Sequence, residues 1–348
     1  MGNNFIIGDE FGLDFVKKVT LDAIAFKNNP QLIPKYPDKS ALFLFFNESL
    51  RTRISSSIAA QKMQMSVICE NMSSLYKFET ENVPMNSDKP EHIKEAARVL
   101  SRYSDIIGLR NSNFIGGRGD ANISPESLIN DDFIYNFASF SKALIVNLES
   151  DAFHPMQGLA DLVTMAENFE NNVDFSGKKV VITYAPHIKH LPIATPQSQI
   201  LSPAMLGANV TLACPPGFEL STKCLDKVAK YSKSFNIEYN QNQALSGADV
   251  VIAKSWLSLE NLQNKTLENS DDYYTKYQNW MLDLGKMNLT NNALFMHCLP
   301  VRRDIEVSSN VLDCANSVII NEAENRLWSQ ISLMHNLFLM SDGKNNSK

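Results

Sequence analysis

Residues 45–53 read Phe-Phe-Asn-Glu-Ser-Leu-Arg-Thr-Arg and connect an apolar run, 41–46, to a helical pattern that continues to Met63. This order predicts a strand that leads into a helix, with Ser49 as the N-cap. A helix N-terminus presents unpaired N–H groups and the positive end of the helix dipole. The hydroxyl and guanidinium groups of residues 49–53 add further donors. Together they favour a pocket for a phosphate or a similar dianion.

The same short stretch also has a simpler interpretation, because Ser-x-Arg-Thr-Arg occurs by chance in many proteins. Ser49 would then be an ordinary helix cap, and Arg51 and Arg53 would lie on a solvated helix face. Motifs further along the chain decide between the two interpretations, and they favour the anion pocket.

Composition limits the classes of protein to consider. The chain has 348 residues, of which 44% are hydrophobic and 20% charged, and its formal net charge is −6. This length is natural for two domains, and the negative charge disfavours non-specific binding to nucleic acid. No apolar run reaches the ~18 residues of a membrane span, and the N-terminus lacks a secretion signal. Five cysteines without a C-x-x-C pair indicate a cytoplasmic setting and no structural zinc or other metal.

Apolar runs alternate with helical periodicity along the chain, which predicts an α/β fold with parallel sheets. The predicted strands are 41–46, 66–69, 105–109, 143–147, 178–184, 209–213, 236–239, 249–253, 294–296 and 317–320. The predicted helices are 49–63, 90–103, 156–169, 197–206, 221–232 and 323–340, with a long loop and a short helix over 111–132. The polar insertion 256–276 is predicted to be a lid or surface loop with one or two helical turns.

The pattern changes near residue 150, which predicts two similar α/β domains, 1–150 and 151–322. In doubly wound sheets, ligands bind at the carboxyl ends of the strands, between the two halves. Motifs with polar side chains are found at these positions or at the start of the last helix. They are Gly108-Leu109-Arg110, His154-Pro155-Met156-Gln157, His297-Cys298-Leu299-Pro300-Val301-Arg302-Arg303 and Glu322-Ala323-Glu324-Asn325-Arg326.

Each of these motifs has a structural alternative when it is taken alone. Arg110 and Arg326 would be ordinary surface arginines, and His154 would cap its own loop. A residue before proline is held extended, however, so the ring of His154 can project into the crevice. Cys298 beside His297 suggests a thiol dyad, but neighbours on a strand point to opposite faces. We therefore expect Cys298 to be a packed residue whose backbone carbonyl accepts hydrogen bonds from a ligand.

Taken together, the motifs resemble those of the carbamoyltransferase (transcarbamylase) family, in the same order, from about residue 40 to residue 335. The resemblance implies a carbamoyl-phosphate-binding domain followed by an amino-acid-binding domain, with the last helix, 323–348, crossing back to the first domain. It also implies a homotrimer with active sites at the subunit interfaces. No metal or other cofactor is expected, because arginines supply the positive charge.

By position, the resemblance assigns the carbamoyl-phosphate site. The phosphate would be held by Ser49, the N–H of Leu50, Arg51, Thr52 and Arg110. The carbamoyl group would contact Thr52, Arg110, His154, Gln157, Arg326 and the carbonyl oxygens of Cys298 and Leu299. A neutral δ-amine attacks the carbamoyl carbon, and donors from Thr52, Arg110 and His154 form an oxyanion hole. The leaving phosphate takes the amine proton, so no protein base is required.

The amine substrate is indicated by a loop after the strand 249–253. Ornithine carbamoyltransferases carry Asp-x-x-x-Ser-Met-Gly there to hold a free ammonium group, whereas this chain has Ala253-Lys254-Ser255-Trp256, without an acid. Glu149 also replaces an asparagine of those enzymes. These features resemble the branch that acts on Nα-acylated ornithine in arginine biosynthesis. The resemblance implies contacts to that substrate from Glu149, His187, Lys254, Leu299 and Arg302.

Within this branch, N-succinylornithine enzymes have a proline where Pro90 stands, and N-acetylornithine enzymes have a glutamate. A glutamate ~5 Å from the succinyl carboxylate, at an effective dielectric constant of ~20, would repel it by about 3 kcal/mol. The loop of Pro90 is expected to reach the neighbouring subunit's site, with Tyr76 as its aromatic contact, and Lys189 would add attraction. Pro90 can also be the first residue of a helix.

The first expectation is therefore an N-succinylornithine carbamoyltransferase, and the alternative is the N-acetylornithine enzyme. A non-catalytic phosphate-binding relative is a remote third possibility. It would be expected to have lost Arg51, His154 or Arg326, and all three are present.

Overall fold

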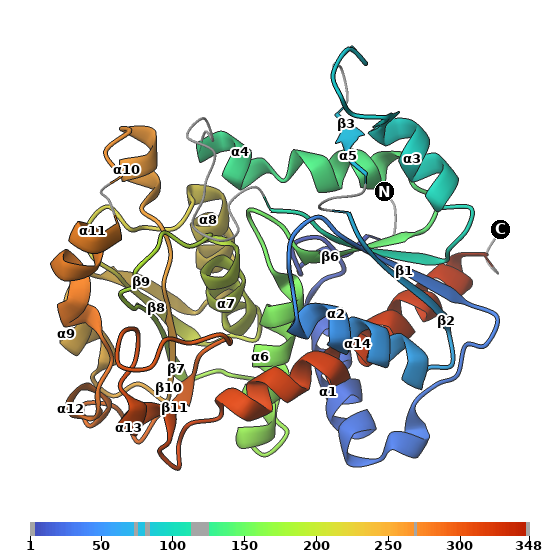
Figure 1. Ribbon diagram of the computed structural model, residues 1–348. Coiled ribbons are helices and arrows are strands. Elements are labelled where there is room, and N and C mark those ends of the chain that lie inside the picture. The colour runs from blue at the N-terminus through green and yellow to red at the C-terminus, as the bar shows by residue number, and fades with distance from the viewer. Residues whose placement is uncertain (1–3, 73–75, 81–83, 113–124, 268–269, 346–348) are drawn as a thin grey trace.

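Two parallel β-sheets, one in each half of the chain, form the framework of the computed structural model (Figure 1), which describes residues 4–72, 76–80, 84–112, 125–267 and 270–345. The first sheet has the order β2 (Ser66–Asn71), β1 (Ser40–Phe45), β5 (Ile106–Arg110) and β6 (Leu144–Glu149). The second has the order β11 (Leu294–Met296), β10 (Val250–Lys254), β7 (Lys179–Tyr184), β8 (Asn209–Ala213) and β9 (Ser234–Glu238). All neighbouring strands run parallel. The predicted fold class is confirmed, and the boundary at residue 150 stays a prediction.

Helices cover both sheets. They are α1 (Leu13–Asn28), α2 (Arg51–Lys62), α3 (Ile93–Leu100), α4 (Pro125–Asn130), α5 (Asp132–Phe140), α6 (Pro155–Asn168), α7 (Ala194–Met205), α8 (Thr222–Tyr231), α9 (Gln241–Leu245), α10 (Leu259–Gln263), α11 (Ser270–Tyr277), α12 (Leu284–Met287), α13 (Ser309–Leu312) and α14 (Ile319–Asn345). Short 3-10 helices lie at Pro30–Leu32 and Gln278–Trp280. Strands β3 (Phe78–Glu79) and β4 (Glu91–His92), which the sequence does not predict, pair with each other.

Strands β5, β6 and β10 are buried along their whole length, as expected for parallel strands with helices on both faces. Their last residues are nevertheless charged: Arg110, Glu149 and Lys254. Arg110 lies opposite Glu149 in the strand register. Because neighbouring parallel strands end at the same edge of a sheet, Arg110 and Glu149 lie side by side, while Lys254 ends a strand of the second sheet.

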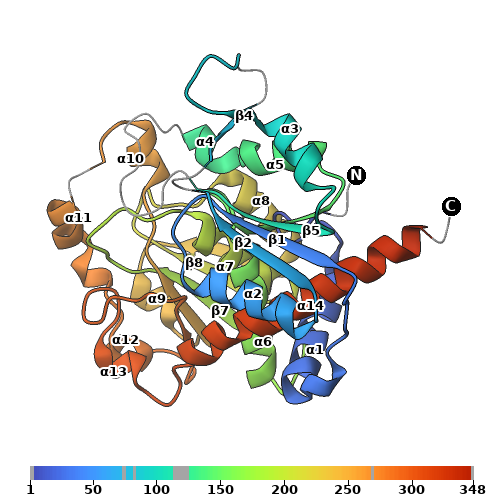
Figure 2. The ribbon, with the colours of Figure 1, turned by 45° about the vertical axis from the view of Figure 1, so that its right-hand side comes forward.

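Helices α6 and α14 join the two halves. Helix α6 is buried from Pro155 to Ala166 and packs against α7 of the second half and α1 of the first. Helix α14 packs against α6, α1 and α2, and the two ribbon views show it running from the second half across the first (Figures 1 and 2). The predicted return of the last helix to the first domain is confirmed.

The strand predicted at 317–320 is wrong. Ser317 forms only an isolated bridge with Phe295, and α14 begins at Ile319. The run Val318-Ile319-Ile320 has high β propensity. The amide of Glu322 nevertheless bonds the carbonyl of Val318, so the helix extends into the run. Tertiary packing of α14 overrides the local preference.

Two predicted helix starts are also wrong. Helix α2 begins at Arg51, its N-cap is Leu50, and no side chain caps it, so Ser49 is not the N-cap. Helix α3 begins at Ile93, after β4, with the side chain of His92 accepting from the amide of Lys94 at 3.2 Å. Pro90 is therefore not a first-turn proline, because pairing of β4 with β3 keeps the chain extended up to residue 92.

The predicted loops differ from the structure in part. Helix α4 accounts for the short helix expected within 111–132, whereas α5 was not predicted, and 113–124 lie outside the described residues. Within 256–276, α10 and α11 supply the expected helical turns. The prediction of a surface loop is wrong for Trp256 and Tyr273, which are buried. Their polar atoms are satisfied: Trp256 Nε1 donates to Phe218 O at 2.8 Å, and Tyr273 Oη donates to Trp256 O at 2.9 Å.

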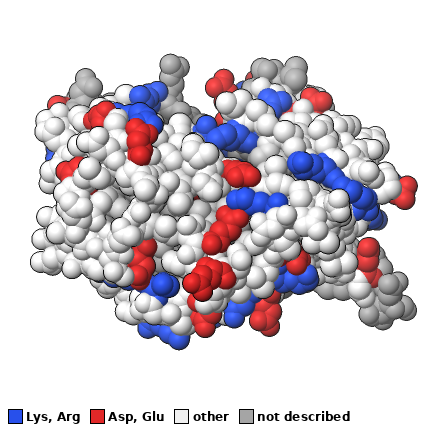
Figure 3. Space-filling view, turned by 90° about the horizontal axis from the view of Figure 1, so that it is seen from below, with Lys and Arg blue, Asp and Glu red and all other residues white. Residues whose placement is uncertain are grey.

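The surface agrees with the charge balance of the sequence. On the face seen from below, basic and acidic side chains lie close to one another along the middle, and basic side chains also form a stripe toward the upper right (Figure 3). Across the described part of the chain, no helix combines the length and apolar character that a membrane crossing requires.

Candidate active site

A cavity of about 570 Å³ lies where the carboxyl ends of β1, β5 and β6 meet those of β10 and β11. Predicted site residues that line it are Ser49, Leu50, Arg51, Thr52, Arg110, Glu149, His154, Gln157, His187, Lys254, Cys298, Leu299, Arg302 and Arg326. Two predicted residues lie elsewhere. Tyr76 lines a separate, mainly apolar cavity beside α3, and Pro90 is exposed just before β4.

The uncapped start of α2 forms one wall of the cavity. Thr52 is buried, and its Oγ1 accepts a hydrogen bond from Arg326 Nη2 at 2.7 Å. The guanidinium of Arg51 is half-buried and has no hydrogen-bond partner among the described residues. Arg53 differs, because its guanidinium lies over the ring of Phe45, 5.5 Å from the centroid, and does not line the cavity. The wall therefore offers helix N–H groups and one unpaired cation to an anion.

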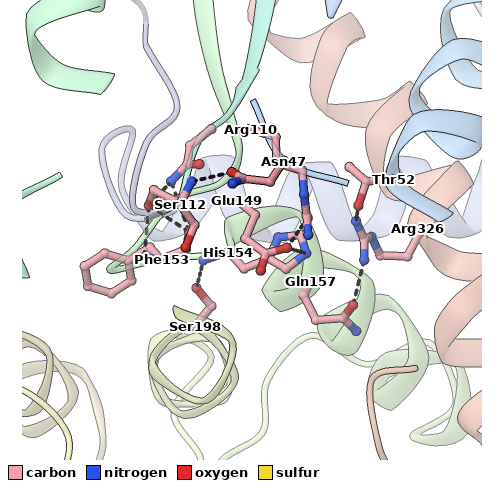
Figure 4. Close-up of polar contacts among 12 residues, drawn as sticks. Asn47, Thr52, Arg110, Ser112, Glu149, Phe153, His154, Gln157, Ser198 and Arg326 are labelled. Atoms are coloured by element: carbon pink, nitrogen blue, oxygen red, sulfur yellow. Dashed lines mark hydrogen bonds and ion pairs between the residues drawn. The ribbon is translucent and has the colours of Figure 1, made fainter. Parts of the chain in front are cut away.

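Arg326 connects this wall to α6. Its Nη1 donates to Gln157 Oε1 at 2.9 Å, while Nη2 bonds Thr52, so the guanidinium lies between the two side chains (Figure 4). Arg326 is buried, and burial lowers its pKa to about 10, which leaves it charged at neutral pH. Its Nε has no hydrogen-bond partner among the described residues.

Arg110, Glu149 and His154 form a second group (Figure 4). Arg110 Nη1 donates to Glu149 Oε2, and the same oxygen lies 3.3 Å from His154 Nε2. Burial, together with the charges of Arg326 and Arg110, lowers the pKa of His154 well below its usual value. The imidazole is therefore neutral at pH 7, and a proton on Nε2 points at the Glu149 carboxylate.

Some of the side chains that line this cavity have buried polar atoms without a hydrogen-bond partner among the described residues. Among the described residues, Arg110 Nε, His154 Nδ1 and Arg326 Nε are buried without a hydrogen-bond partner, and all three side chains line the cavity. Buried polar groups in native proteins are generally paired with protein, water or ligand. The cavity wall is therefore prepared for a polar ligand.

The other end of the cavity belongs to the second half of the chain. Arg302 Nε donates to His187 Nε2 at 3.0 Å, and burial lowers the pKa of His187. Lys254 is 8% exposed, and no described residue hydrogen-bonds its ammonium group. Burial lowers the pKa of Lys254, but Cys298, Glu306 and further carboxylates raise it, and the net shift is upward. This end therefore holds a buried positive charge.

The sequence did not predict Glu306, which also lines the cavity. Its Oε2 accepts from the amide of Arg302 at 2.7 Å, and its Oε1 lies 3.5 Å from His297 Nε2. Burial raises its pKa, but the interactions with His297, Lys254 and the Arg302 amide lower it to about 2. The signal in the sequence that could have identified Glu306 is an acidic residue a few positions after an arginine pair. The remaining unpredicted lining residues are Glu48, Leu191, Pro192, Thr195, Pro300 and Val301.

Cys298 and His297 do not form a thiol dyad. His297 Nδ1 lies 2.8 Å from the carbonyl oxygen of Cys298, not from its thiol. Burial raises the pKa of the Cys298 thiol to about 12, so the thiol stays protonated at neutral pH.

A Glu306→Gln variant is expected to change the pH dependence of stability. The pKa of Glu306 is about 2 in the fold against 4.5 normally, so its stabilising contribution is complete above pH ~5 and is lost as the pH falls toward 2. The difference in the free energy of unfolding between wild type and variant should therefore shrink by about 2 kcal/mol from pH 6 to pH 3. Urea unfolding at each pH measures it. Glu95→Gln, whose side chain is 59% exposed, is the control. A difference independent of pH would contradict the expectation.

Comparisons with known proteins agree on one family. The profile of the aspartate/ornithine carbamoyltransferase carbamoyl-P binding domain matches residues 4–167, and that of the Asp/Orn binding domain matches residues 194–337. N-acetylornithine carbamoyltransferase of Xanthomonas campestris pv. campestris is 35% identical over 320 residues, covering 90% of this chain and 91% of that protein. N-succinylornithine carbamoyltransferase of Bacteroides fragilis is 36% identical over 291 residues, covering 83% and 84%.

A similar solved structure is a mutant of N-acetyl-L-ornithine transcarbamylase, with proline in place of a glutamate, complexed with carbamyl phosphate and N-succinyl-L-norvaline. It has a TM-score of 0.85 and 32% identity, and the match covers 96% of this chain and 99% of that chain.

Proposed function

The chain belongs to the aspartate/ornithine carbamoyltransferase family, and from this premise we propose that it transfers the carbamoyl group of carbamoyl phosphate to the δ-amine of N-succinyl-L-ornithine. The products are N-succinyl-L-citrulline and phosphate, and the step belongs to arginine biosynthesis. Relatives named for N-acetylornithine and for N-succinylornithine both support an acylated ornithine as the acceptor.

The proposal depends above all on the two positive ends of one cavity. Arg51, Arg110 and Arg326 lie at the α2 end, where a dianionic phosphate would bind. Lys254 and Arg302 lie at the other end, where the α-carboxylate of the acylated amino acid would bind. A buried lysine in that position would repel the α-ammonium group of free ornithine, and the carboxylate of Glu306 at this end already accepts from the Arg302 amide.

In the proposed reaction, hydrogen-bond donors and positively charged side chains stabilise the negative charge that develops during carbamoyl transfer. The lone pair of the δ-nitrogen forms a bond to the carbamoyl carbon, and the bond from that carbon to the phosphate oxygen then breaks. Negative charge builds on the carbamoyl oxygen, which would accept from His154, Thr52 and Arg110. Each such donor is worth ~3–4 kcal/mol in acyl-transfer enzymes. The departing phosphate takes the amine proton.

The geometry supports these roles for Thr52 and His154. Thr52 Oγ1 accepts from Arg326, and no described residue accepts its hydroxyl proton, which would be donated to the carbamoyl oxygen. His154 is neutral because of its burial, so its Nε2 proton would also be donated. In the structure this nitrogen and Arg110 face Glu149. We infer that the substrates replace these contacts and that Glu149 turns to accept the amide N–H of the acylated α-nitrogen.

The succinyl group is favoured over the acetyl group by charge. By the family resemblance, Pro90 stands where the acetyl enzymes carry a glutamate, and the exposed Lys189 lines the cavity. The complex of a glutamate-to-proline mutant with N-succinyl-L-norvaline is consistent with this assignment. N-acetyl-L-ornithine is the alternative substrate, because relatives of both kinds have similar identity.

The active unit in this proposal is a homotrimer. Tyr76, 39% exposed, and the exposed Pro90 do not line the cavity of their own chain. Contact between Pro90 and the acyl group therefore requires a neighbouring subunit, whose cavity the loop 84–90 would complete.

The test of the proposed function is a comparison of three acceptors. Initial rates with carbamoyl phosphate should give the highest kcat/KM with N-succinyl-L-ornithine, a lower value with N-acetyl-L-ornithine and the lowest with ornithine. A preference for free ornithine would overturn the substrate class. A preference for the acetyl compound would overturn the succinyl assignment alone.

A Pro90→Glu variant is expected to lower kcat/KM for N-succinyl-L-ornithine about a hundredfold and to change that for the acetyl compound only a few-fold. The physical reason is repulsion of about 3 kcal/mol between two carboxylates ~5 Å apart. Pro84→Glu is the matched control, because Pro84 is an exposed proline of the same loop. Equal selectivity in wild type and Pro90→Glu would mean that Pro90 does not approach the acyl group.

A further inference from the structure

Two carboxyl groups that the proposed chemistry does not use lie beside Gln157. Asp161 follows Gln157 by one turn of α6, and Glu322 lies in the first turn of α14. Both are 0% exposed. Burying a carboxyl group is unfavourable unless its hydrogen bonds are satisfied. A pair of such groups at the edge of an active site therefore requires an explanation.

The hydrogen bonds of Gln157 supply that explanation. Its Nε2 donates to Asp161 Oδ1 at 2.8 Å and to Glu322 Oε1 at 2.8 Å, which uses both amide hydrogens. Its Oε1 accepts from Arg326 Nη1 at 2.9 Å. Those carboxyl oxygens accept hydrogen bonds and a guanidinium only donates, so the amide has a single favourable orientation. In the reverse orientation the amide N–H groups would face the Arg326 guanidinium, which cannot accept a hydrogen bond.

Glu322 also reaches the third segment of the carbamoyl site. Its Oε2 accepts from the amide of His297 at 2.9 Å, directly before Cys298 and Leu299. Burial raises the pKa of Asp161 to about 7, and burial with the neighbouring Asp161 raises that of Glu322 well above its usual value. Two full negative charges on this buried pair are therefore disfavoured at neutral pH.

We propose that Asp161 and Glu322 are positioning residues for carbamoyl transfer, because they hold the amide of Gln157 with its oxygen toward the cavity, as an acceptor for the carbamoyl NH2 group. The inference rests on the proposed function, since it requires carbamoyl phosphate in the cavity. It adds the reason why the site distinguishes a carbamoyl group from an acetyl group of the same shape. A site built to hydrogen-bond an N–H group discriminates strongly against an analogue that lacks it.

Binding selectivity provides the test, without an acceptor substrate. Dissociation constants of the full-length protein are measured for carbamoyl phosphate, for acetyl phosphate (a methyl group in place of NH2) and for inorganic phosphate. Wild type should prefer carbamoyl phosphate over acetyl phosphate. Asp161→Leu should reduce this preference about tenfold, as expected when one buried hydrogen bond is lost. It should leave the dissociation constant of inorganic phosphate nearly unchanged. Asp161→Asn, which retains an acceptor for Gln157, should keep most of the preference.

Two results would overturn the inference. One is an equal loss of affinity for all three ligands, which would indicate a structural role only, and the other is an unchanged preference in folded Asp161→Leu. Glu322→Met provides the same comparison if Asp161→Leu does not fold, as judged by circular dichroism. If wild type binds carbamoyl phosphate selectively but carbamoylates none of the three acceptors, the proposed function fails while the positioning role stands.

Discussion

Replacing Arg326 by methionine is expected to lower kcat/KM for carbamoyl phosphate by about a thousandfold, the effect of losing one donor worth ~4 kcal/mol. Arg326 is buried, bonds both Gln157 and Thr52, and has an unpaired Nε at the cavity wall. Methionine keeps part of the apolar volume but removes the charge and every donor. Gln157 Oε1 then loses its partner, and the phosphate loses a buried cation. Steady-state kinetics at saturating acceptor measure the change.

The matched control is Arg303→Met. Arg303 is also close to a site motif in the sequence, but its guanidinium is exposed and pairs with Asp313. Exposed ion pairs contribute about 0–1 kcal/mol, so this variant should stay within about twofold of wild type. Folded Arg326→Met with more than a tenth of the wild-type kcat/KM would contradict the proposed place of Arg326 in the site.

Replacing Lys254 by methionine is expected to lower kcat/KM for N-succinyl-L-ornithine about a hundredfold, with little change in the KM for carbamoyl phosphate. Lys254 ends β10 inside the cavity, and its buried ammonium group has no hydrogen-bond partner among the described residues. Without it, the α-carboxylate of the acceptor would be buried with one cation fewer. Removing one member of a buried charge pair typically costs 2–5 kcal/mol.

Lys179→Met is the control for the Lys254 experiment. Lys179 begins β7 of the same sheet, at the end opposite the cavity, and donates to Ser246 O at 2.7 Å. Its replacement should leave both kinetic constants within about twofold, as for most surface substitutions. If Lys254→Met raised the KM for carbamoyl phosphate as much as that for the acceptor, Lys254 would not belong to the acceptor end.

Much of the fold follows from local patterns in the sequence. Buried parallel strands produce continuous apolar runs, so 209–213 and 294–296 coincide with β8 and β11. Within each sheet the ends of such strands meet at one edge, and the carboxyl ends of both sheets face the same cavity, which charged residues as distant as Arg110 and Lys254 line. Local propensity failed at 317–320, where packing of α14 against α6, α1 and α2 sustains a helix through a β-branched run.

Other features of the site could not be predicted, because they depend on contacts between distant residues. Asp161 and Glu322 meet at Gln157 only because α14 packs on α6. Glu306 is recognised as a site residue only from the fold, because the fold places it between His297 and the Arg302 amide. Ser49 resembles an N-cap in sequence, but the chain uses Leu50 and leaves the helix end open toward the cavity. Tyr76 and Pro90 lie away from the cavity of their own chain, so their assignment requires a second subunit.

In the proposed reaction, one cavity holds a dianionic carbamoyl donor at its arginine-rich end and an acylated ornithine at its lysine end. Carbon-13 NMR of labelled carbamoyl phosphate with the purified protein and N-succinyl-L-ornithine follows this transfer. The label should move to the ureido carbon of N-succinyl-L-citrulline, with one equivalent of phosphate released. The proposed reaction would be contradicted if the label stayed in carbamoyl phosphate and its spontaneous breakdown products, or entered citrulline in preference when ornithine is supplied in equal amount.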